Sequence, residues 1–299
     1  MEHAAFDPSP GEVQELEPGI RRILAPNPSP MTFRGTNTYL VGTRRLAIID
    51  PGPGDPAHLE AILGALSPGE SVSHILVTHS HVDHSALVPP LREATGAPVL
   101  AFGDSAAGRN PEIAALSGLG GGEGIDAGFA PDRCLADGEG VAGDGWALTA
   151  LWTPGHMGNH MCFALGDAVF TGDHVMGWAT SMVSPPDGDL TAFMASLEKL
   201  RGRRDRVFYP AHGAPVADPE ARLAELLAHR RGREAQILSA LDGGPADAAT
   251  LTARIYSDVP EALLPAARRN VLAHLIDLTQ RGLAAPKGEL SAGAVFTRV

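Results

Sequence analysis

Short apolar runs alternate with helix-like stretches over residues 10–215, and most of the runs stop at a turn that contains glycine or proline. Residues 46–49, for example, end at Asp50 and the turn 51–54. A run bounded in this way is typical of a buried strand. Strands that alternate with helices predict a layered α/β domain. The predicted strands are 46–49, 74–78, 98–102, 146–152, 161–165, 168–171 and 206–209, and the predicted helices are 56–66, 85–95, 190–200 and 218–240.

The last 60 residues have a different pattern. Helix-like stretches cover 247–257 and 260–281, and in the second of them apolar residues recur at the three, four and seven residue steps of one buried helix face. Residues 294–299 could form a short strand. We therefore expect a helix–turn–helix with a wing over 240–299. The glycine-rich segment 103–145 is expected to be mostly loop.

Composition restricts the class of protein. The 299 residues carry a formal net charge of −12, which argues against an extended nucleic-acid groove. No apolar run approaches the roughly 20 residues of a membrane helix, and residues 1–30 lack the pattern of a signal peptide. The two cysteines, Cys134 and Cys162, offer neither a disulfide framework nor a thiolate zinc site. We expect a cytoplasmic protein without a membrane partner.

Residues 78–84 read Thr-His-Ser-His-Val-Asp-His and come directly after a predicted strand. In extended backbone His79 and His81 point the same way, so both can bind one metal ion. Asp83 and His84 lie just beyond and can turn toward a second ion. Neutral imidazole and carboxylate are the ligands that zinc and similar divalent cations prefer. This spacing predicts a metal site at the end of the strand.

Three later predicted strands each end close to a further candidate ligand. These candidates are His156, Asp173 and His212. Each of them lies directly beside a glycine, with proline nearby in two of the three turns, and such residues fix a tight turn and allow close approach of the backbone. One such residue alone would indicate little, but after the motif at 78–84 all three are predicted to bind metal.

The order of these residues resembles that of the metallo-β-lactamase superfamily, an αβ/βα sandwich of dinuclear metal hydrolases. Residues 30–42, 229–234 and 270–275 also resemble the β-lactamase-like protein 2 branch, which carries a C-terminal winged-helix-like domain and includes an endoribonuclease that acts on single-stranded RNA. The resemblance implies a four-layer αβ/βα sandwich over residues 1–217. It implies a linker helix and a small winged-helix-like domain over 218–299.

Carried over residue by residue, the resemblance also implies two groups of ligands. His79, His81 and His156 would bind the first ion, Asp83, His84 and His212 would bind the second, and Asp173 would bridge them. The two ions would be zinc, or alternatively manganese or iron, and would share a hydroxide that attacks the substrate. Asp83 would also orient or deprotonate the water. His160 matches a histidine of this branch and would donate a hydrogen bond to the developing charge or protonate the leaving group, unless it is a surface imidazole.

Other polar residues near the motif have both a functional and a structural interpretation. Asp50 matches a position that orients the first ligand loop by hydrogen bonds, or it is a plain turn-starting aspartate. His174 is expected to point away from the ions if Asp173 points toward them. Packing or surface roles are expected for His58, His74, His229 and His274.

Two further features could contact a substrate. The segment 176–186 either covers the cleft and selects substrate or is a simple surface loop. The basic run 201–206 and the pair formed by Arg230 and Arg231 either bind phosphate groups or are solvated charges at helix ends.

The leading hypothesis is a dinuclear metal-dependent hydrolase of this branch, with cleavage of single-stranded RNA as its most specific version. The alternative enzyme is an ester, thioester or lactone hydrolase that resembles glyoxalase II and acts on a small molecule. An alternative of another class is a nucleic-acid-binding protein with a vestigial metal site. Self-association into a homo-oligomer through the C-terminal part is a further expectation.

Overall fold

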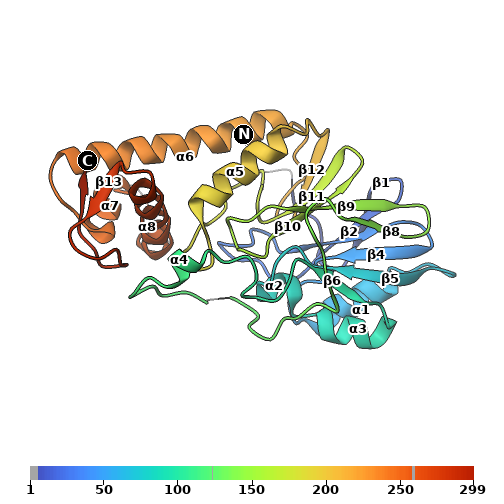
Figure 1. The fold of residues 1–299 in the computed structure, drawn as a ribbon. Coiled ribbons are helices and arrows are strands. Elements are labelled where there is room, and N and C mark those ends of the chain that lie inside the picture. The colour runs from blue at the N-terminus through green and yellow to red at the C-terminus, as the bar shows by residue number, and fades with distance from the viewer. Residues whose placement is uncertain (1–5, 123, 258–259) are drawn as a thin grey trace.

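The structure is a computed structural model of the chain, and it describes residues 6–122, 124–257 and 260–299. Two β-sheets form the centre of the larger part of the molecule (Figure 1). The first sheet runs in chain order through β1 (Val13–Glu17), β2 (Ile20–Leu24), β3 (Asn37–Val41), β4 (Arg45–Ile49), β5 (Ser71–Leu76), β6 (Val99–Ala101) and β7 (Arg133–Cys134). The second runs in the order β12 (Val207–Pro210), β11 (Ala168–Gly172), β10 (Met161–Leu165), β9 (Ala147–Trp152) and β8 (Gly140–Ala142).

Parallel pairing occurs in both sheets where candidate ligands were predicted. In the first sheet β4 pairs with β5 in parallel, and in the second β11 pairs with β12 in parallel. The carboxyl ends of parallel neighbours lie at the same sheet edge. Loops that follow these strands are therefore brought together without any long excursion of the chain.

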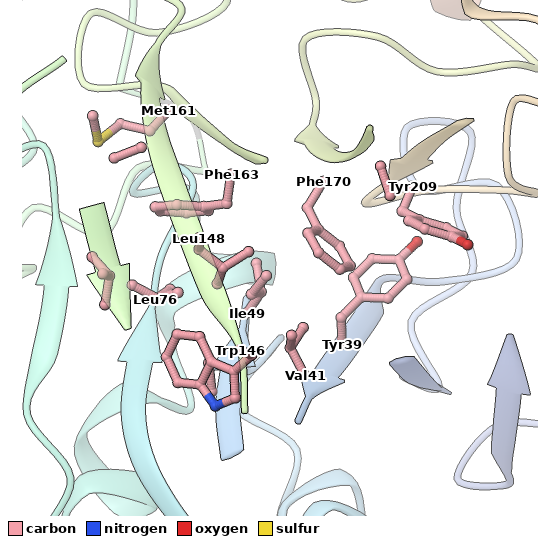
Figure 2. Packing of buried hydrophobic residues seen from close by; sticks show 14 of the residues in the cluster. Tyr39, Val41, Ile49, Leu76, Trp146, Leu148, Met161, Phe163, Phe170 and Tyr209 are labelled. Atoms are coloured by element: carbon pink, nitrogen blue, oxygen red, sulfur yellow. The ribbon is translucent and has the colours of Figure 1, made fainter. Parts of the chain in front are cut away.

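The space between the sheets is filled by side chains from both of them (Figure 2). Tyr39 and Ile49 come from the first sheet, and Phe163 and Phe170 come from the second; all four are at most 2% exposed. The ring centroids of Tyr39 and Phe170 lie 5.0 Å apart. Alternate residues of the same strands, such as Ile48, point to the opposite face. This period of two is what a sheet covered on both faces requires.

Helices cover the outer faces. Helices α1 (Pro56–Gly64) and α3 (Val88–Thr95) pack on the first sheet, and α5 (Leu190–Arg201) and the start of α6 (Pro219–Asp242) pack on the second. The four-layer αβ/βα sandwich predicted from the sequence is confirmed. Short helices α2 (Val82–Ser85) and α4 (Pro111–Ala114) lie in connecting segments. No helix of the described chain is both long and apolar enough to cross a bilayer.

The C-terminal part has its own core and is joined to the sandwich by α6, which runs along both (Figure 1). It contains α7 (Ala248–Ile255), a 3₁₀ turn (Glu261–Leu263), α8 (Leu264–Gln280) and the antiparallel pair β13 (Ala284–Pro286) and β14 (Phe296–Arg298). Val271, Leu275 and Leu278 are fully buried in this core, as their helical spacing predicted. The predicted helix pair with a wing is confirmed.

The N-terminal strands of the first sheet differ from expectation. The strands β1, β2 and β3 were not predicted, because β2 carries two arginines and β3 two buried polar residues, which hide the apolar pattern. The segment 103–145 is mostly loop, as expected, but it also has short regular elements. It contains α4 and the edge strands β7 and β8, which are two and three residues long and too short to show a periodicity.

Two buried histidines make the folded chain sensitive to acid. Burial lowers the pKa of His58 to about 4 and that of His274 to about 3. Both rings are neutral in the folded chain, whereas in the unfolded chain they bind a proton below about pH 6.5. Because the unfolded state then binds more protons, the free energy of unfolding falls as the pH falls from about 6.5 toward 4.

We expect His274→Leu to reduce the fall in the free energy of unfolding that accompanies acidification. Neither ring nitrogen of His274 has a hydrogen-bond partner among the described residues, so leucine removes a titrating group without breaking a hydrogen bond. Urea unfolding of wild type and variant at about pH 7.5 and about pH 5 measures the effect. An equal loss of stability in both proteins between the two pH values would contradict the assignment.

Candidate metal centre

The candidate ligands come from loops that follow strands at one edge of the sandwich. His79, His81, Asp83 and His84 follow β5, and His156 lies in the turn between β9 and β10. Asp173 comes directly after β11, and His212 comes after β12. The seven side chains span 134 positions of the sequence and meet in one place. The structure thus brings together every residue for which the sequence predicted a metal role.

One group consists of His79, His81, His156 and Asp173, whose potential ligand atoms all lie within 4.8 Å of one another. Nδ1 of His81 lies 2.8 Å from Nε2 of His79 and 3.1 Å from Nε2 of His156. Oδ2 of Asp173 lies 3.9 Å from the Nε2 atom of His79 and 3.6 Å from that of His156. Three ring nitrogens and one carboxylate oxygen therefore face a common centre.

The other group consists of Asp83, His84 and His212. Oδ2 of Asp83 lies 3.5 Å from Nε2 of His84 and 3.3 Å from Nε2 of His212. The second carboxylate oxygen of Asp173, Oδ1, lies 3.5 Å and 3.2 Å from the same two nitrogens. Asp173 thus presents one oxygen to each group, as a bridging ligand would.

Hydrogen bonds on the far side of the rings orient the histidines. Nδ1 of His84 donates to Oδ2 of Asp50 at 2.9 Å, and Nδ1 of His212 donates to the carbonyl of Gly35 at 3.1 Å. Nδ1 of His156 donates to the carbonyl of Met182 at 2.7 Å. A ring whose Nδ1 carries the proton leaves the Nε2 lone pair free to bind a cation.

Asp50 connects this network to the ligand loop. Its carboxylate accepts hydrogen bonds from the backbone N and the hydroxyl of Thr78, at 2.7 and 2.8 Å, besides the one from His84. The hydroxyl of Thr78 lies 3.0 Å from Nδ1 of His79 and can accept a hydrogen bond from it. Asp50 therefore orients ligand residues through hydrogen bonds, which is the functional one of its two interpretations.

The electrostatics of the two groups suit cations. Burial lowers the pKa of His79 well below its usual value and that of His81 to about 3, which keeps both rings neutral. Burial acts in the same direction on His212, but the carboxylate of Asp173 outweighs it and raises the pKa to about 9. The first group thus offers neutral lone pairs, and the second lies where carboxylates favour positive charge.

The donor set fits a pair of divalent metal ions. Nε2 of His84 and Oδ1 of Asp173 are buried and have no hydrogen-bond partner among the described residues. Nδ1 of His81 carries at most one proton, so it cannot donate a full hydrogen bond to Nε2 of both His79 and His156. Ligands of a tetrahedral zinc ion, at about 2.0–2.1 Å from the metal, lie about 3.3 Å from one another. The separations in both groups lie around this value.

His160 and His174 lie behind the ligands. His160 is fully buried, with its ring centroid 5.1 Å from that of His79, and burial lowers its pKa well below the usual value. A buried, neutral ring has no proton readily available for a leaving group, so its placement argues against the general-acid role, whereas a hydrogen bond to the developing charge stays a prediction. His160 is also not the surface imidazole of the alternative. The ring of His174 packs against that of Phe193, with 4.6 Å between the ring centroids, as the structural interpretation predicted.

The predicted phosphate-binding arginines have other partners. Arg201, Arg203 and Arg206 form ion pairs with Glu220, Asp205 and Glu17, respectively. Arg231 pairs with Glu198. Arg230 is buried instead of solvated, and it donates hydrogen bonds to Ser181 and Asn270. These contacts favour structural roles for the basic residues.

Sequence reasoning identified Asp50 but missed the other groups that orient the ligands. The carbonyls of Gly35 and Met182 have no side-chain signal, and Thr78 was placed only as the end of a strand. The segment 176–186 was expected to cover the cleft or to be a simple surface loop. It contains Met182, so it also orients a candidate ligand.

Gly155 allows the turn that carries His156. Its φ is +140°, and a Cβ atom there would lie 2.3 Å from Cα of Phe193 on α5. We expect Gly155→Ala to lower the free energy of unfolding by about 1–3 kcal/mol and to weaken metal binding, because the turn must move away from α5. Gly166→Ala is the matched control, since Gly166 also has a positive φ but opens on empty space. Equal stability loss in the two variants would contradict the clash.

The comparisons with known proteins agree with this geometry. Residues 31–212 match the metallo-beta-lactamase superfamily, and residues 248–292 match the beta-lactamase associated winged helix domain. The chain is 35% identical over 238 residues to the lactamase-like protein adaB of Aspergillus niger, an alignment that covers 77% of this chain and 66% of that protein. It is 36% identical over 249 residues to the atrochrysone carboxyl ACP thioesterase AgnL7 of Paecilomyces divaricatus, covering 81% of this chain and 70% of that protein.

A solved structure shares the fold over the length of the chain. The crystal structure of a beta-lactamase domain protein from Burkholderia ambifaria has a TM-score of 0.83 at 22% identity, and the match covers 99% of this chain and 96% of that one. The match with adaB, by contrast, spans slightly less than two thirds of that relative's length. The family match, which covers more than half of the sequence, shows that this chain is a member of the metallo-beta-lactamase superfamily of metal-dependent hydrolases and carries the winged helix domain associated with it.

Proposed function

We propose that the chain is a dinuclear metal-dependent hydrolase that cleaves thioesters. The seven side chains at the sheet edge would hold the two ions, with Asp173 shared between them. The observation that carries the dinuclear assignment is the placement of the two Asp173 oxygens, each facing a different group of ring nitrogens. A complete set of donor atoms is also unlike a vestigial site, from which ligands would have been lost.

The residues of this chain have distinct tasks in such a reaction. Two divalent cations, when bound, supply Lewis-acid activation of a water molecule and of the substrate carbonyl. Asp83 and His81 are the two of the seven candidate ligands that are partly exposed, so they lie nearest to an entering substrate. The Asp83 side chain is 23% exposed, and its carboxylate would accept the proton of the attacking water. The enclosed residues Asp50 and Thr78 hold the ligand loop still.

The leaving group decides between thioester and RNA. A thiol has a pKa of about 8.5 and leaves as a thiolate without a strong acid. The alkoxide released from RNA is closer in basicity to hydroxide, whose parent water has a pKa of about 15.7, and needs a proton donor. His160, which was expected to be that donor, is enclosed and neutral. This placement supports the thioester over single-stranded RNA.

The names of the relatives point the same way. AgnL7 is named an acyl-carrier-protein thioesterase, and neither relative described above is named a ribonuclease. The ion pairs of the basic run 201–206 leave little charge there for a phosphate backbone. A thioester carried on a protein or on a small thiol is therefore the substrate class we propose.

A panel of substrates assayed with one preparation tests the proposal. The zinc-loaded chain is incubated with an aromatic acyl thioester of N-acetylcysteamine, with the matching oxygen ester and with a single-stranded RNA oligonucleotide. We expect release of free thiol, and we expect the double variant His81→Ala/His84→Ala to lose bound metal and turnover together. Cleavage of the RNA without thiol release, or full activity in the double variant, would overturn the proposal.

A further inference from the structure

Two C-terminal stretches that the proposed function does not use, 229–234 and 270–275, meet beside the metal centre. Arg230 lies on α6 and Asn270 lies on α8, and Nη1 of Arg230 donates a hydrogen bond to Oδ1 of Asn270 at 2.9 Å. Arg230 is 4% exposed, and its guanidinium lies 5.0 Å from the ring centroid of Phe193. Among the described residues its partners are uncharged oxygens. Burial of a cation without a neighbouring carboxylate costs folding free energy. This cost indicates a role of Arg230 beyond stability.

Both residues hold the same short segment, 181–183. Nη2 of Arg230 donates a hydrogen bond to the carbonyl of Ser181, and the backbone N of Val183 donates one to Oδ1 of Asn270 at 3.2 Å. Ser181 and Val183 are at most 1% exposed. The segment is thus fixed at its first residue by α6 and at its last residue by α8.

The same segment holds two of the candidate metal ligands. The carbonyl of Met182, between the two fixed residues, accepts the hydrogen bond from Nδ1 of His156 at 2.7 Å. The hydroxyl of Ser181 donates to the carbonyl of Asp173 and also lies 2.9 Å from the carbonyl of His174. Ring orientation at His156 and backbone position at Asp173 therefore depend on segment 181–183.

We propose that Arg230 and Asn270 are positioning residues of the metal centre, which act through segment 181–183 on His156 and Asp173. The winged-helix domain is then part of the metal site, and not only an appended binding module. This inference rests on the metal ligands assigned under the proposed function. A hydrogen-bond partner directly behind a ligand, here the carbonyl of Met182, typically changes metal affinity by about 10–100-fold, and Arg230 and Asn270 hold the residues on either side of that carbonyl.

Four variants of the intact chain separate this role from a general effect on folding. Asn270→Leu removes the acceptor for both Val183 and Arg230, whereas Asn270→Asp keeps an oxygen in place. Arg230→Met removes the donors of Arg230. Arg222→Met is the matched control, because Arg222 is also buried on α6 and donates to the carbonyls of Met176 and Ala179 at 2.8 and 2.7 Å. Within the described chain, neither of these carbonyls accepts a hydrogen bond from a candidate ligand.

The measurement is a zinc titration of each metal-stripped protein against a chromophoric chelator, with thermal unfolding of the metal-stripped proteins in parallel. We expect Asn270→Leu and Arg230→Met to bind zinc about 10–100-fold more weakly than wild type, and Asn270→Asp and Arg222→Met to bind it about as tightly as wild type. If Asn270→Leu does not fold, Arg230→Lys replaces it in the test. Lysine keeps the charge but donates to only one of the two oxygens at a time, so this variant is also expected to bind zinc more weakly than wild type.

Two results would overturn the inference and leave the proposed function standing. The first is that Asn270→Leu and Arg230→Met bind zinc as tightly as wild type. The second is that Arg222→Met loses as much zinc affinity as these two variants. Failure of the wild-type chain to bind zinc would instead overturn the ligand assignment itself, and the inference with it.

Discussion

Asp173→Ala is expected to lower kcat/KM for the proposed thioester hydrolysis by on the order of 10³-fold or more. The substitution removes one ligand atom from each group and the link between them. Metal ions supply several kcal/mol of transition-state stabilisation, and about 1.4 kcal/mol corresponds to a tenfold change in rate. A loss of about 4 kcal/mol therefore gives the stated factor. Steady-state release of free thiol measures the effect.

Asp167→Ala is the matched control for this prediction. Asp167 lies immediately before the opposite end of β11, is largely exposed and pairs with Arg206. An exposed pair of this kind contributes little, so we expect near wild-type turnover. Turnover of Asp173→Ala within tenfold of wild type would contradict a shared carboxylate at the centre of the reaction.

Asp50→Ala is expected to lower the free energy of unfolding by about 3 kcal/mol or more and to weaken metal binding by about 10–100-fold. The carboxylate of Asp50 is buried and accepts three hydrogen bonds, two from Thr78 and one from His84. Its loss leaves buried donors unpaired. The φ of Asp50 is +51°, a conformation that aspartate adopts more readily than alanine, which adds to the penalty. Urea unfolding and zinc titration measure the two effects.

Asp55→Ala is the comparison variant for Asp50→Ala. Asp55 lies in the same turn and caps α1 by accepting a hydrogen bond from the backbone N of His58 at 3.0 Å. Removal of such a cap lowers stability by about 1 kcal/mol, and no candidate ligand depends on it. Equal effects of the two substitutions on zinc binding would contradict the orienting role of Asp50.

The candidate ligands could be predicted from the sequence because each of them follows a strand. A strand that ends at a turn fixes where the next side chain lies, and parallel neighbours such as β11 and β12 bring Asp173 and His212 to one edge. The alternation of strands and helices predicted a layered α/β domain, and the resemblance to the superfamily implied its four layers. The fold and the set of converging side chains are thus encoded largely in local patterns.

Apart from the role of Asp50, the contacts that orient the ligands could not be predicted in this way. Met182 and Gly35 act through backbone carbonyls, and every residue type has one. Asn270 is 114 positions from His156, and only the packing of α8 against the sandwich brings it near. His160 is four residues from His156, but the chain turns into β10 directly after it and encloses its ring. Such outcomes depend on tertiary packing, which residue spacing does not encode.

The number of metal ions bound by the intact chain tests the central claim most directly. The claim is that seven side chains from four loops form two adjoining cation sites that share Asp173. Equilibrium zinc titration of the metal-stripped protein, with element analysis of the bound fraction, counts the ions. We predict two per chain in wild type and fewer in Asp173→Ala. Binding of one ion or none by the wild-type chain, or two ions in Asp173→Ala with wild-type affinity, would contradict the claim.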